Sequence, residues 1–397
     1  MALHTLEKTL EPKRGLAFSF LTLFLPFMAM YATEIRMYTW TMLFVTLTAI
    51  YAYRIVKEYK IKNWILFAIF SLCAAHCHYY GLVTVAIING LLSLYILFSK
   101  KIPKKKYIIT FIIIAIAQIA GYLPWIPIFL KQANAVSHGY WIPLTWGDTV
   151  VAPLGVQFNG KLSIAVTAVY TLIMYSYLIY QIICNKKQGK PITLAMFCLA
   201  VHFILYFSML IVTVLIKPIM YYRYMLITTG VLIFPFAYYI ANSERKHQKV
   251  ISLIVVLIVL TLGIYNNMII VRDIYEPANG TEVEYIKGQY QDNTIILYKD
   301  IYHATNIFVQ MPEYNWYLYN LDEKHDLKPF ENFSPPLKII FEEKELQNYK
   351  GRIILIDREG SEWYNEMVEK YELKELTRNR IRTPYRGSDY QIITVEK

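Results

Sequence analysis

Residues 32–38 place a glutamate and an arginine two positions apart, between two long apolar runs. Glu34 offers a carboxylate that can accept a proton, and Arg36 offers a guanidinium that can hold a phosphate through two hydrogen bonds. Charges at a membrane boundary are costly to desolvate, so such a pair is a candidate functional site. The alternative is that both residues cap helix ends in the lipid headgroup layer. The sequence around Glu34 and Arg36 helps to choose between a functional site and two helix caps.

The apolar runs are long enough to cross a bilayer. Hydrophobic residues make up 56% of the 397 residues, and the mean hydropathy is +0.33. A transmembrane helix needs about 20 mostly apolar residues. The sequence therefore predicts a polytopic α-helical membrane protein with about nine transmembrane helices in a domain of residues 1–271. The predicted helices cover residues 15–32, 38–56, 63–80, 82–98, 107–128, 161–184, 192–216, 222–241 and 250–271.

The charge distribution predicts the orientation of these helices. Residues 1–271 hold 23 Lys or Arg against 6 Asp or Glu, whereas residues 272–397 carry a net charge of −6. Eighteen of the 23 cations lie in alternate turns, which the positive-inside rule assigns to the cytoplasm. The N-terminus is then cytoplasmic, and the C-terminal domain is extracytoplasmic. The basicity is a topology signal and excludes nucleic acid as the expected partner.

The outward ends of the predicted helices gather cations, histidines and tyrosines. Arg36 and Arg223 each lie at such an end, where a guanidinium can bind a phosphate in a bidentate manner. This is the chemistry needed to hold a lipid phosphate whose sugar projects outward. The alternative is an aromatic belt with snorkelling cations, which is common in multispan proteins.

A connection of about 30 residues follows Leu130, and its length predicts a lid or a surface helix. It contains Trp141, Pro143, Trp146 and Asp148. Tryptophans suit both the headgroup layer and stacking against sugar rings, and the sequence does not separate these two roles. Asp148 and Glu34 are the two acidic residues expected on the outer side before the C-terminal domain.

Three elements together resemble the GT-C glycosyltransferases, including the dolichyl-phosphate-mannose protein mannosyltransferase-like and aminoarabinose-transferase-like families. The stretch YATEIRMYTWTMLF, from residue 31, is similar to the family's Ser/Ala-x-Glu-x-Arg-Met-Tyr signature. The stretch AHCHYYGL (residues 75–82) is similar to a Thr-His-Tyr-x-Gly element, and RYMLI (residues 223–227) to the Arg-Tyr opening of a late helix. A terminal extracytoplasmic domain of mixed α/β character is also typical of the family.

The resemblance implies an activity and roles for particular residues. Members reside in the plasma membrane and transfer a sugar from a polyprenyl-phosphate donor on its extracytoplasmic side. No nucleotide takes part. Arg36 and Arg223 would contact the donor phosphate, and Glu34 would orient Arg36 or the acceptor, or act as an improvised catalytic base. The donor cavity would be lined by Tyr38, His78, Tyr79 and Tyr222. No cofactor is required by the sequence, and no residue pattern decides on a divalent metal.

The chain departs from the family pattern at its start. The family carries a catalytic Asp-Glu or Asp-Asp pair in its first outer loop, several helices before the Glu-x-Arg-Met-Tyr element. Here that element already lies in the first outer loop. The expectations are a truncated chain, a separately encoded N-terminal half, or lost catalysis. Neither the donor sugar nor the acceptor is indicated.

Residues 272–397 read as a small α/β domain. Short apolar runs next to turn residues predict strands at 293–298, 337–341, 352–357 and 390–395. Trp363, Met367 and Tyr371 recur at helical spacing after Ser361, which predicts a helix over 361–371 with Ser361 as its N-cap. The cation-rich stretch of residues 378–386 is predicted to be a loop.

Cys73, His76, Cys77 and His78 have the residue types of a metal site, but no second Cys/His cluster completes it. A helix-packing face is the preferred interpretation.

Two other functions compete with sugar transfer, namely a carrier or flippase for a lipid-linked saccharide and a noncatalytic membrane scaffold. A carrier is expected to have broken helices and polar groups near the bilayer midplane. The nearly uncharged middles of these helices favour chemistry at the outer surface.

Overall fold

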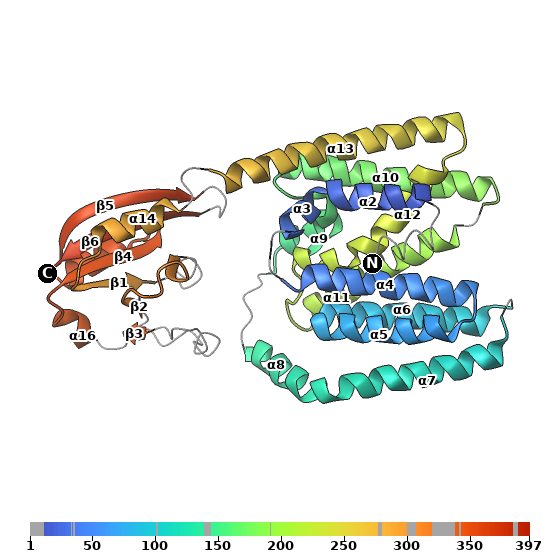
Figure 1. The fold of residues 1–397 in the computed structure, drawn as a ribbon, viewed down its shortest axis with the longest axis horizontal. Coiled ribbons are helices and arrows are strands. Elements are labelled where there is room, and N and C mark those ends of the chain that lie inside the picture. Colours follow the sequence, from blue (N-terminus) through green and yellow to red (C-terminus); the bar gives the residue numbers. More distant parts are fainter. Residues whose placement is uncertain are drawn as a thin grey trace. The chain divides into compact units, whose positions relative to one another are not determined.

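The computed structural model describes residues 12–32, 34, 36–100, 102–138, 144–190, 192–276, 280–299, 307–319, 338–340, 343–383 and 388–397. The chain forms two compact units, Met1–Met268 and Ile269–Lys397, where the sequence predicted a boundary after residue 271 (Figure 1). The first unit is helical, and the second is built around one sheet.

The helices of the first unit run close together along most of their length (Figure 1). The α-helices are α2 (Pro12–Phe24), α3 (Pro26–Ala32), α4 (Tyr38–Lys57), α5 (Ile61–Cys77), α6 (Tyr79–Phe98), α7 (Lys104–Tyr122), α8 (Ile126–His138), α9 (Ala152–Gly155), α10 (Ile164–Lys187), α11 (Thr193–Leu215), α12 (Thr229–Asn242) and α13 (Lys246–Ile274). Three 3₁₀ segments, η1 (Leu123–Trp125), η3 (Val156–Phe158) and η4 (Tyr222–Thr228), and one π-helix, η2 (Trp146–Val151), adjoin them.

Seven helices in the described part of the chain are long and apolar enough to span a membrane, which is compatible with a membrane protein. The predicted helix over 63–80 corresponds to α5, which has only 17 residues. The predicted helix over 15–32 is not a single straight element. It is the pair α2 and α3, bent by 71°, and it would count as an eighth span if the two halves cross together.

Pro26 explains the bend. A proline within a helix lacks the N–H that would bond to the preceding turn, and its ring clashes with that turn. Helix α2 therefore ends at Phe24, and α3 begins anew at Pro26. The backbone N–H of Met28 bonds to the carbonyl of Leu25, which closes the corner. The short α3 then ends at Ala32, and the break before α4 carries Glu34 and Arg36.

Two glycines allow close approach of helices beside this break. A Cβ at Gly81 in α6 would lie 2.3 Å from the backbone oxygen of Ala74 in α5 and 2.8 Å from the Thr41 side chain in α4. A Cβ at Gly230 in α12 would lie 1.9 Å from the hydroxyl oxygen of Thr46 in α4. Contacts this short are not tolerated, so α4 can pack against both neighbours only because these residues are glycines.

The connection after Leu130 differs from the predicted lid. Helix α8 continues to His138 and its described side chains are largely exposed, as expected for a surface helix. Residues 144–158, however, fold as η2, α9 and η3 and pack into the bundle, with Thr149, Val156 and Phe158 buried. Apolar and small residues drive the burial of Thr149 and of most of residues 153–158, so this part of the stretch belongs to the core, whereas residues 144–148 are exposed. Trp141 and Pro143 lie outside the described residues.

The second unit holds six strands in the order β3-β2-β1-β4-β6-β5. The strands are β1 (Thr294–Tyr298), β2 (Trp316–Tyr319), β3 (Lys338–Ile340), β4 (Arg352–Arg358), β5 (Lys374–Thr383) and β6 (Ser388–Glu396). Strands β1 to β4 pair in parallel, and β6 pairs antiparallel with both β4 and β5. Helices α14 (Thr281–Gln289), α16 (Glu343–Gln347) and α17 (Trp363–Lys370) complete the unit, which buries side chains on both faces of the sheet.

The four predicted strands are confirmed as β1, β3, β4 and β6, and the predicted buried stripe Trp363, Met367 and Tyr371 is confirmed in and just after α17. Helix α17 begins two residues after Ser361, and Glu362 occupies the N-cap position. The Ser361 hydroxyl instead donates to the Asp357 carboxylate at 2.6 Å and accepts from the Trp363 N–H at 3.3 Å. Strand β2 was not predicted.

The predicted cation-rich loop is wrong, because its first half is the ten-residue strand β5 at one edge of the sheet. The guanidinium of Arg378 pairs with Glu375 at 2.7 Å, and that of Arg380 pairs with Glu359 and Asp389, both at 2.7 Å. These carboxylates, which the sequence does not reveal as partners, compensate the charges of Arg378 and Arg380. Ile381 points the other way and is buried. Residues 384–387, which include Arg386, lie outside the described part.

Candidate functional site

The break between α3 and α4 carries the ion pair of Glu34 and Arg36. The Nε atom of Arg36 lies 3.2 Å from Oε2 of Glu34, and the backbone N–H of Arg36 bonds to the Glu34 carbonyl at 2.9 Å. Side-chain exposure is 46% for Arg36 and 34% for Glu34, so both remain reachable from solvent. Arg36 also interacts with the side chain of Tyr38 in the first turn of α4. The pair is thus fixed to the bundle through Tyr38, which is buried.

His78 lies between α5 and α6 and faces Tyr38, with ring centroids 5.5 Å apart. Its extended backbone ends α5 and begins α6, and its Nδ1 accepts a hydrogen bond from the Tyr80 N–H at 3.0 Å. Burial, together with the nearby Arg223 guanidinium, lowers the pKa of His78 from 6.5 to about 4. At neutral pH the imidazole is therefore uncharged, and the bond to Nδ1 leaves its proton on Nε2, available to a ligand oxygen.

Arg223 lies at the start of η4, among side chains from three other segments. Its Cζ atom stacks over the Tyr221 ring at 4.8 Å from the centroid. It also interacts electrostatically with Tyr31, Tyr38 and Tyr224. Arg223 is half-buried, so its charge acts in surroundings where electrostatic interactions are stronger than in bulk water. Arg223, Tyr38 and His78 are therefore brought together, as the sequence expectation required.

Tyr222, the neighbour of Arg223, joins the same group from another side. Its ring lies 4.4 Å from that of Tyr221 and 6.3 Å from that of Phe27 in α3. Tyr222 interacts electrostatically with Asp148 of η2, and Tyr31 interacts with both Tyr222 and Glu34. Glu34 and Asp148 therefore border the segment that carries Arg223. We call the set of Tyr31, Tyr38, His78, Tyr80, Tyr221, Tyr222, Arg223 and Tyr224 the aromatic–arginine cluster.

The segment before η4 is held in place by hydrogen bonds to neighbouring helices. The Tyr80 hydroxyl donates to the Ile219 carbonyl at 2.8 Å, and the Met220 N–H donates to the Thr213 hydroxyl at 2.9 Å. Each ties residues 217–221 to a different helix, α6 in one case and α11 in the other. Such bonds pre-organise Arg223 before any ligand arrives.

Tyr79 is the predicted site residue that points elsewhere. Its hydroxyl donates to the Gln132 side chain, and its ring packs against Phe129 at 5.1 Å. Both partners lie on α8, so Tyr79 joins α6 to that helix and does not take part in the aromatic–arginine cluster. Adjacent residues at a helix start face different directions, which the sequence alone did not resolve.

Four cluster members were absent from the predicted site, namely Tyr31, Tyr80, Tyr221 and Tyr224. The ring of Tyr224 lies 4.9 Å from that of Tyr80 and 5.3 Å from that of His78, which places it at the centre of the group. All four neighbour the quoted motifs in sequence. With 35 tyrosines in the chain, residue type alone could not separate them from the rest.

The cysteine and histidine motif does not converge on one point. His76 Nδ1 bonds to the Leu72 carbonyl at 2.9 Å, and its ring packs against Tyr122 and Trp125. His78 faces the aromatic–arginine cluster instead. Among the residues that the structure describes, no group of three or more His, Cys, Asp or Glu side chains is arranged to hold a metal ion.

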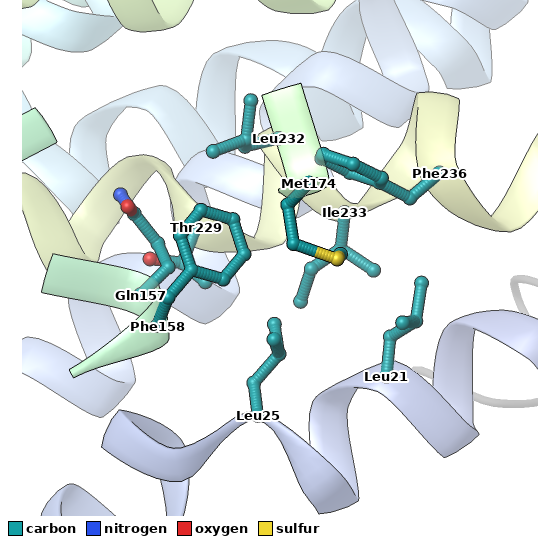
Figure 2. Close-up of a pocket in the computed structure, with 9 residues that line it drawn as sticks. All are labelled: Leu21, Leu25, Gln157, Phe158, Met174, Thr229, Leu232, Ile233 and Phe236. Carbon is teal, nitrogen blue, oxygen red and sulfur yellow. The ribbon is translucent and has the colours of Figure 1, made fainter. Parts of the chain in front are cut away.

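A small cavity lies inside the bundle, apart from the cluster residues (Figure 2). It measures about 10 Å³ and is lined by Leu21 and Leu25 of α2, Gln157 and Phe158 of η3, Met174 of α10, and Thr229, Leu232, Ile233 and Phe236 of α12. A space of this size holds at most about one water molecule and excludes a sugar or a prenyl chain. We therefore assign it to core packing and not to the candidate site.

The cluster combines one stacked arginine, a neutral histidine donor and several tyrosine hydroxyls, and Arg36, which is in reach of solvent, adjoins it through Tyr38. These groups offer hydrogen-bond donors and positive charge without a fixed metal, which suits a phosphate monoester or diester. Tyrosine rings beside them suit a sugar or a prenyl chain. No family model, no curated protein and no solved structure matches this chain.

Proposed function

We propose that this chain is a membrane glycosyltransferase that takes a sugar from a polyprenyl-phosphate donor and transfers it to an acceptor outside the cytoplasm. The observation that supports it most is the position of Arg223, half-buried and stacked on Tyr221 beside the neutral His78. Arg36 supplies a second guanidinium at the solvent side. The resemblance of residues 31–44, 75–82 and 223–227 to GT-C enzymes gives the same assignment from the sequence.

In this proposal the residues of the cluster have separate tasks. Arg223 and Arg36 hold the donor phosphate and stabilise the charge that develops on it as the bond to the sugar breaks. His78 donates its Nε2 proton to a phosphate oxygen, and Tyr38 and Tyr222 line the donor cavity. A sugar phosphate whose charge is met in this way is a good leaving group. The remaining requirement is a base for the acceptor hydroxyl.

The proposed topology has about nine membrane crossings, a cytoplasmic N-terminus, an extracytoplasmic C-terminal domain and a plasma-membrane location. It requires that α2 and α3 cross together and that the 17-residue α5 also crosses. Alkaline phosphatase fused after Lys397 should be active in a bacterial host, because the enzyme matures only outside the cytoplasm. An inactive fusion with normal expression would contradict the orientation.

The decisive experiment measures lipid-phosphate binding to the purified full chain in nanodiscs, with farnesyl phosphate as the probe. Arg223→Ala should weaken binding at least about tenfold, since charge-assisted hydrogen bonds contribute about 1.5–3 kcal/mol. Arg54→Ala is the matched control, because Arg54 stacks over Tyr51 at 4.9 Å near the far end of α4. Equal losses in both variants, or unchanged binding in Arg223→Ala, would reject the phosphate site.

A carrier for a lipid-linked saccharide is the second candidate, and one observation favours it. Broken helices are typical of carriers, and α2–α3 is bent by 71° next to the cluster. The two functions differ in the fate of the sugar. With a labelled polyprenyl-phosphate sugar in proteoliposomes, an enzyme releases the label from the lipid, whereas a carrier moves it across the bilayer still attached. If the probe does not bind at all, a membrane scaffold becomes the better interpretation.

A further inference from the structure

Two acidic residues border the aromatic–arginine cluster, and their surroundings differ. The carboxylate of Glu34 is paired with Arg36 at 3.2 Å. The guanidinium that it faces is the one needed for the phosphate. Asp148 is exposed, and within the described part of the chain no Lys or Arg lies within ion-pair distance of it. Among the described residues, Asp148 is thus the one of these two acids that has no ion pair with a cation.

The Asp148 carboxylate is oriented by its own turn of chain. The Thr145 hydroxyl donates to Oδ2 of Asp148 at 3.1 Å and accepts from the Asp148 N–H at 3.1 Å. The Thr145 N–H in turn donates to the hydroxyl of the buried Thr149 at 3.3 Å. One carboxylate oxygen is therefore occupied, and the other is left to meet a ligand from solvent.

This turn is itself anchored in the bundle next to Arg223. Asp148 lies in the π-helix η2, a rare conformation that occurs frequently at functional sites. The Tyr206 hydroxyl of α11 donates to the Val150 carbonyl at 2.9 Å, and the Tyr175 hydroxyl of α10 donates to the Leu154 carbonyl at 3.2 Å. The following α9 packs against η4, and Asp148 interacts with Tyr222, the residue before Arg223. A rigid segment thus holds the carboxylate beside the proposed phosphate site.

We propose that Asp148, and not Glu34, is the general base that activates the acceptor hydroxyl, an assignment that rests on the proposed function. Asp148 takes the proton from the acceptor hydroxyl as its oxygen forms a bond to the anomeric carbon of the donor. The bond from that carbon to the phosphate oxygen breaks, and its electron pair leaves with the polyprenyl phosphate. Arg223 and Arg36 stabilise the phosphate dianion so formed. Glu34 has the separate role of positioning Arg36.

The test compares Asp148→Asn and Glu34→Gln in the full chain, with Glu244→Gln as the control. Glu244 is another exposed acid of the helical unit, paired with Lys190 at 2.6 Å and remote in sequence from the cluster segments. The readouts are sugar transfer and farnesyl phosphate affinity. Polyprenyl-phosphate mannose, glucose, galactose and aminoarabinose serve as donors, and envelope membranes of the source cell supply the acceptor.

Asp148→Asn should lower the transfer rate about 10²- to 10⁴-fold, the usual contribution of a general base, with farnesyl phosphate affinity within about twofold of wild type. Glu34→Gln should reduce transfer less than about tenfold, and Glu244→Gln should change neither readout. In Asp148→Ala, added formate should restore part of the rate, because it supplies a diffusible carboxylate. A merely structural role for Asp148 would not give this rescue.

The two proposals fail in distinguishable ways. If wild type transfers sugar and Asp148→Asn does so at an undiminished rate, the base assignment is wrong and the proposed function stands. If Asp148→Asn loses affinity for farnesyl phosphate as severely as it loses transfer, Asp148 holds the donor and is not the base. If wild type binds farnesyl phosphate but uses none of the four donors, both the transferase function and the base assignment fall.

Discussion

Two arginine–tyrosine stacks in the helical unit have nearly the same geometry and very different surroundings. The Cζ atom of Arg223 lies 4.8 Å from the Tyr221 ring centroid, and that of Arg54 lies 4.9 Å from the Tyr51 centroid. Arg54 is in the last turn of α4, among the lysines of a cation-rich turn. Arg223 is surrounded by tyrosines from α3, α4 and the segment before η4, together with a neutral histidine.

This difference shows that an arginine stacked on a tyrosine does not by itself make a candidate phosphate site. A helix rises about 1.5 Å per residue, so Arg54 lies about 24 Å along α4 from Tyr38, which belongs to the cluster. At its own end of α4, the Arg54 guanidinium lies over the Tyr51 ring in a turn that also carries Lys57. At the other end, four chain segments bring donors to one half-buried charge. The following experiments use residues at the two ends, or along one helix, as matched pairs.

The largest expected effect is on the pH dependence of stability. The pKa of His78 falls from 6.5 in the unfolded chain to about 4 in the fold. Between these values the unfolded state binds more protons, so stability should fall as the pH is lowered from 6.5 to 4, by up to about 3 kcal/mol. His78→Gln should reduce this slope in thermal unfolding curves, whereas the exposed His247, at the start of α13, should be replaceable by Gln without effect on it. An unaltered slope in His78→Gln would place the titrating group elsewhere.

The next effect compares two glycines on α6. Gly81→Ala puts a methyl group 2.3 Å from the Ala74 carbonyl oxygen, a backbone atom that cannot swing away. We expect a loss of about 2 kcal/mol in stability, the usual result of overpacking, and weaker farnesyl phosphate binding. At Gly90 an added Cβ meets nothing within 4 Å, so Gly90→Ala should leave stability unchanged or raise it by up to about 1 kcal/mol. Similar melting temperatures for the two variants would contradict the close approach.

Lysine substitution separates charge from geometry at the two stacks. Arg223→Lys keeps the charge but loses the planar fork and the stacking that suit a phosphate. Farnesyl phosphate affinity should fall about tenfold, which corresponds to about 1.4 kcal/mol. Arg54→Lys should leave the affinity unchanged. If Arg223→Lys binds as well as wild type, the contact is a simple point charge and the bidentate assignment is wrong.

The smallest effect concerns two tyrosine hydroxyls that hold backbone carbonyls. Tyr80 donates to Ile219 at 2.8 Å near the cluster, and Tyr107 donates to Ile55 at 3.1 Å near the other end of the bundle. Replacing either with Phe should cost about 1 kcal/mol of stability, the net value of one hydrogen bond. Only Tyr80→Phe should also weaken farnesyl phosphate binding, because it frees the segment before Arg223. Equal binding by both variants would show that this segment needs no such anchor.

The sequence allowed much of the architecture to be predicted, because apolar runs and short strand patterns are local signals. The helices match the predicted runs within a few residues, and four strands were found from β-branched clusters. The bend at Pro26 is also a local signal, yet the run over 15–32 was taken as one helix. Strand β5 was missed because its outward arginines hide the alternation with Thr377 and Ile381. The partner of Arg378 is Glu375 of the same strand, whereas Arg380 pairs with Glu359 and Asp389 from outside it.

The candidate site was predictable only in part. Arg36, Arg223, Tyr38, His78 and Tyr222 are predicted because they lie at helix ends on one expected side. The structure brings Tyr38, His78 and Tyr222 around Arg223 or beside it, and Arg36 interacts with Tyr38. Tyr79 and His78 differ by one position and face different elements, which depends on the exact start of α6. The position of Asp148 depends on how residues 144–158 fold back into the bundle. No local pattern indicates that burial.

The outer edge of β5 has a consequence for how this protein behaves at high concentration. A ten-residue strand with a free side is a template on which a second copy could add its own strand. Here the register shifts between Glu375 and Thr377, and the guanidinium groups of Arg378 and Arg380 are already engaged by carboxylates. An incoming strand would meet a bulge near the start of β5, which disfavours continuous pairing along this edge. At high concentration, the irregular edge of β5 therefore favours separate copies over sheets joined edge to edge.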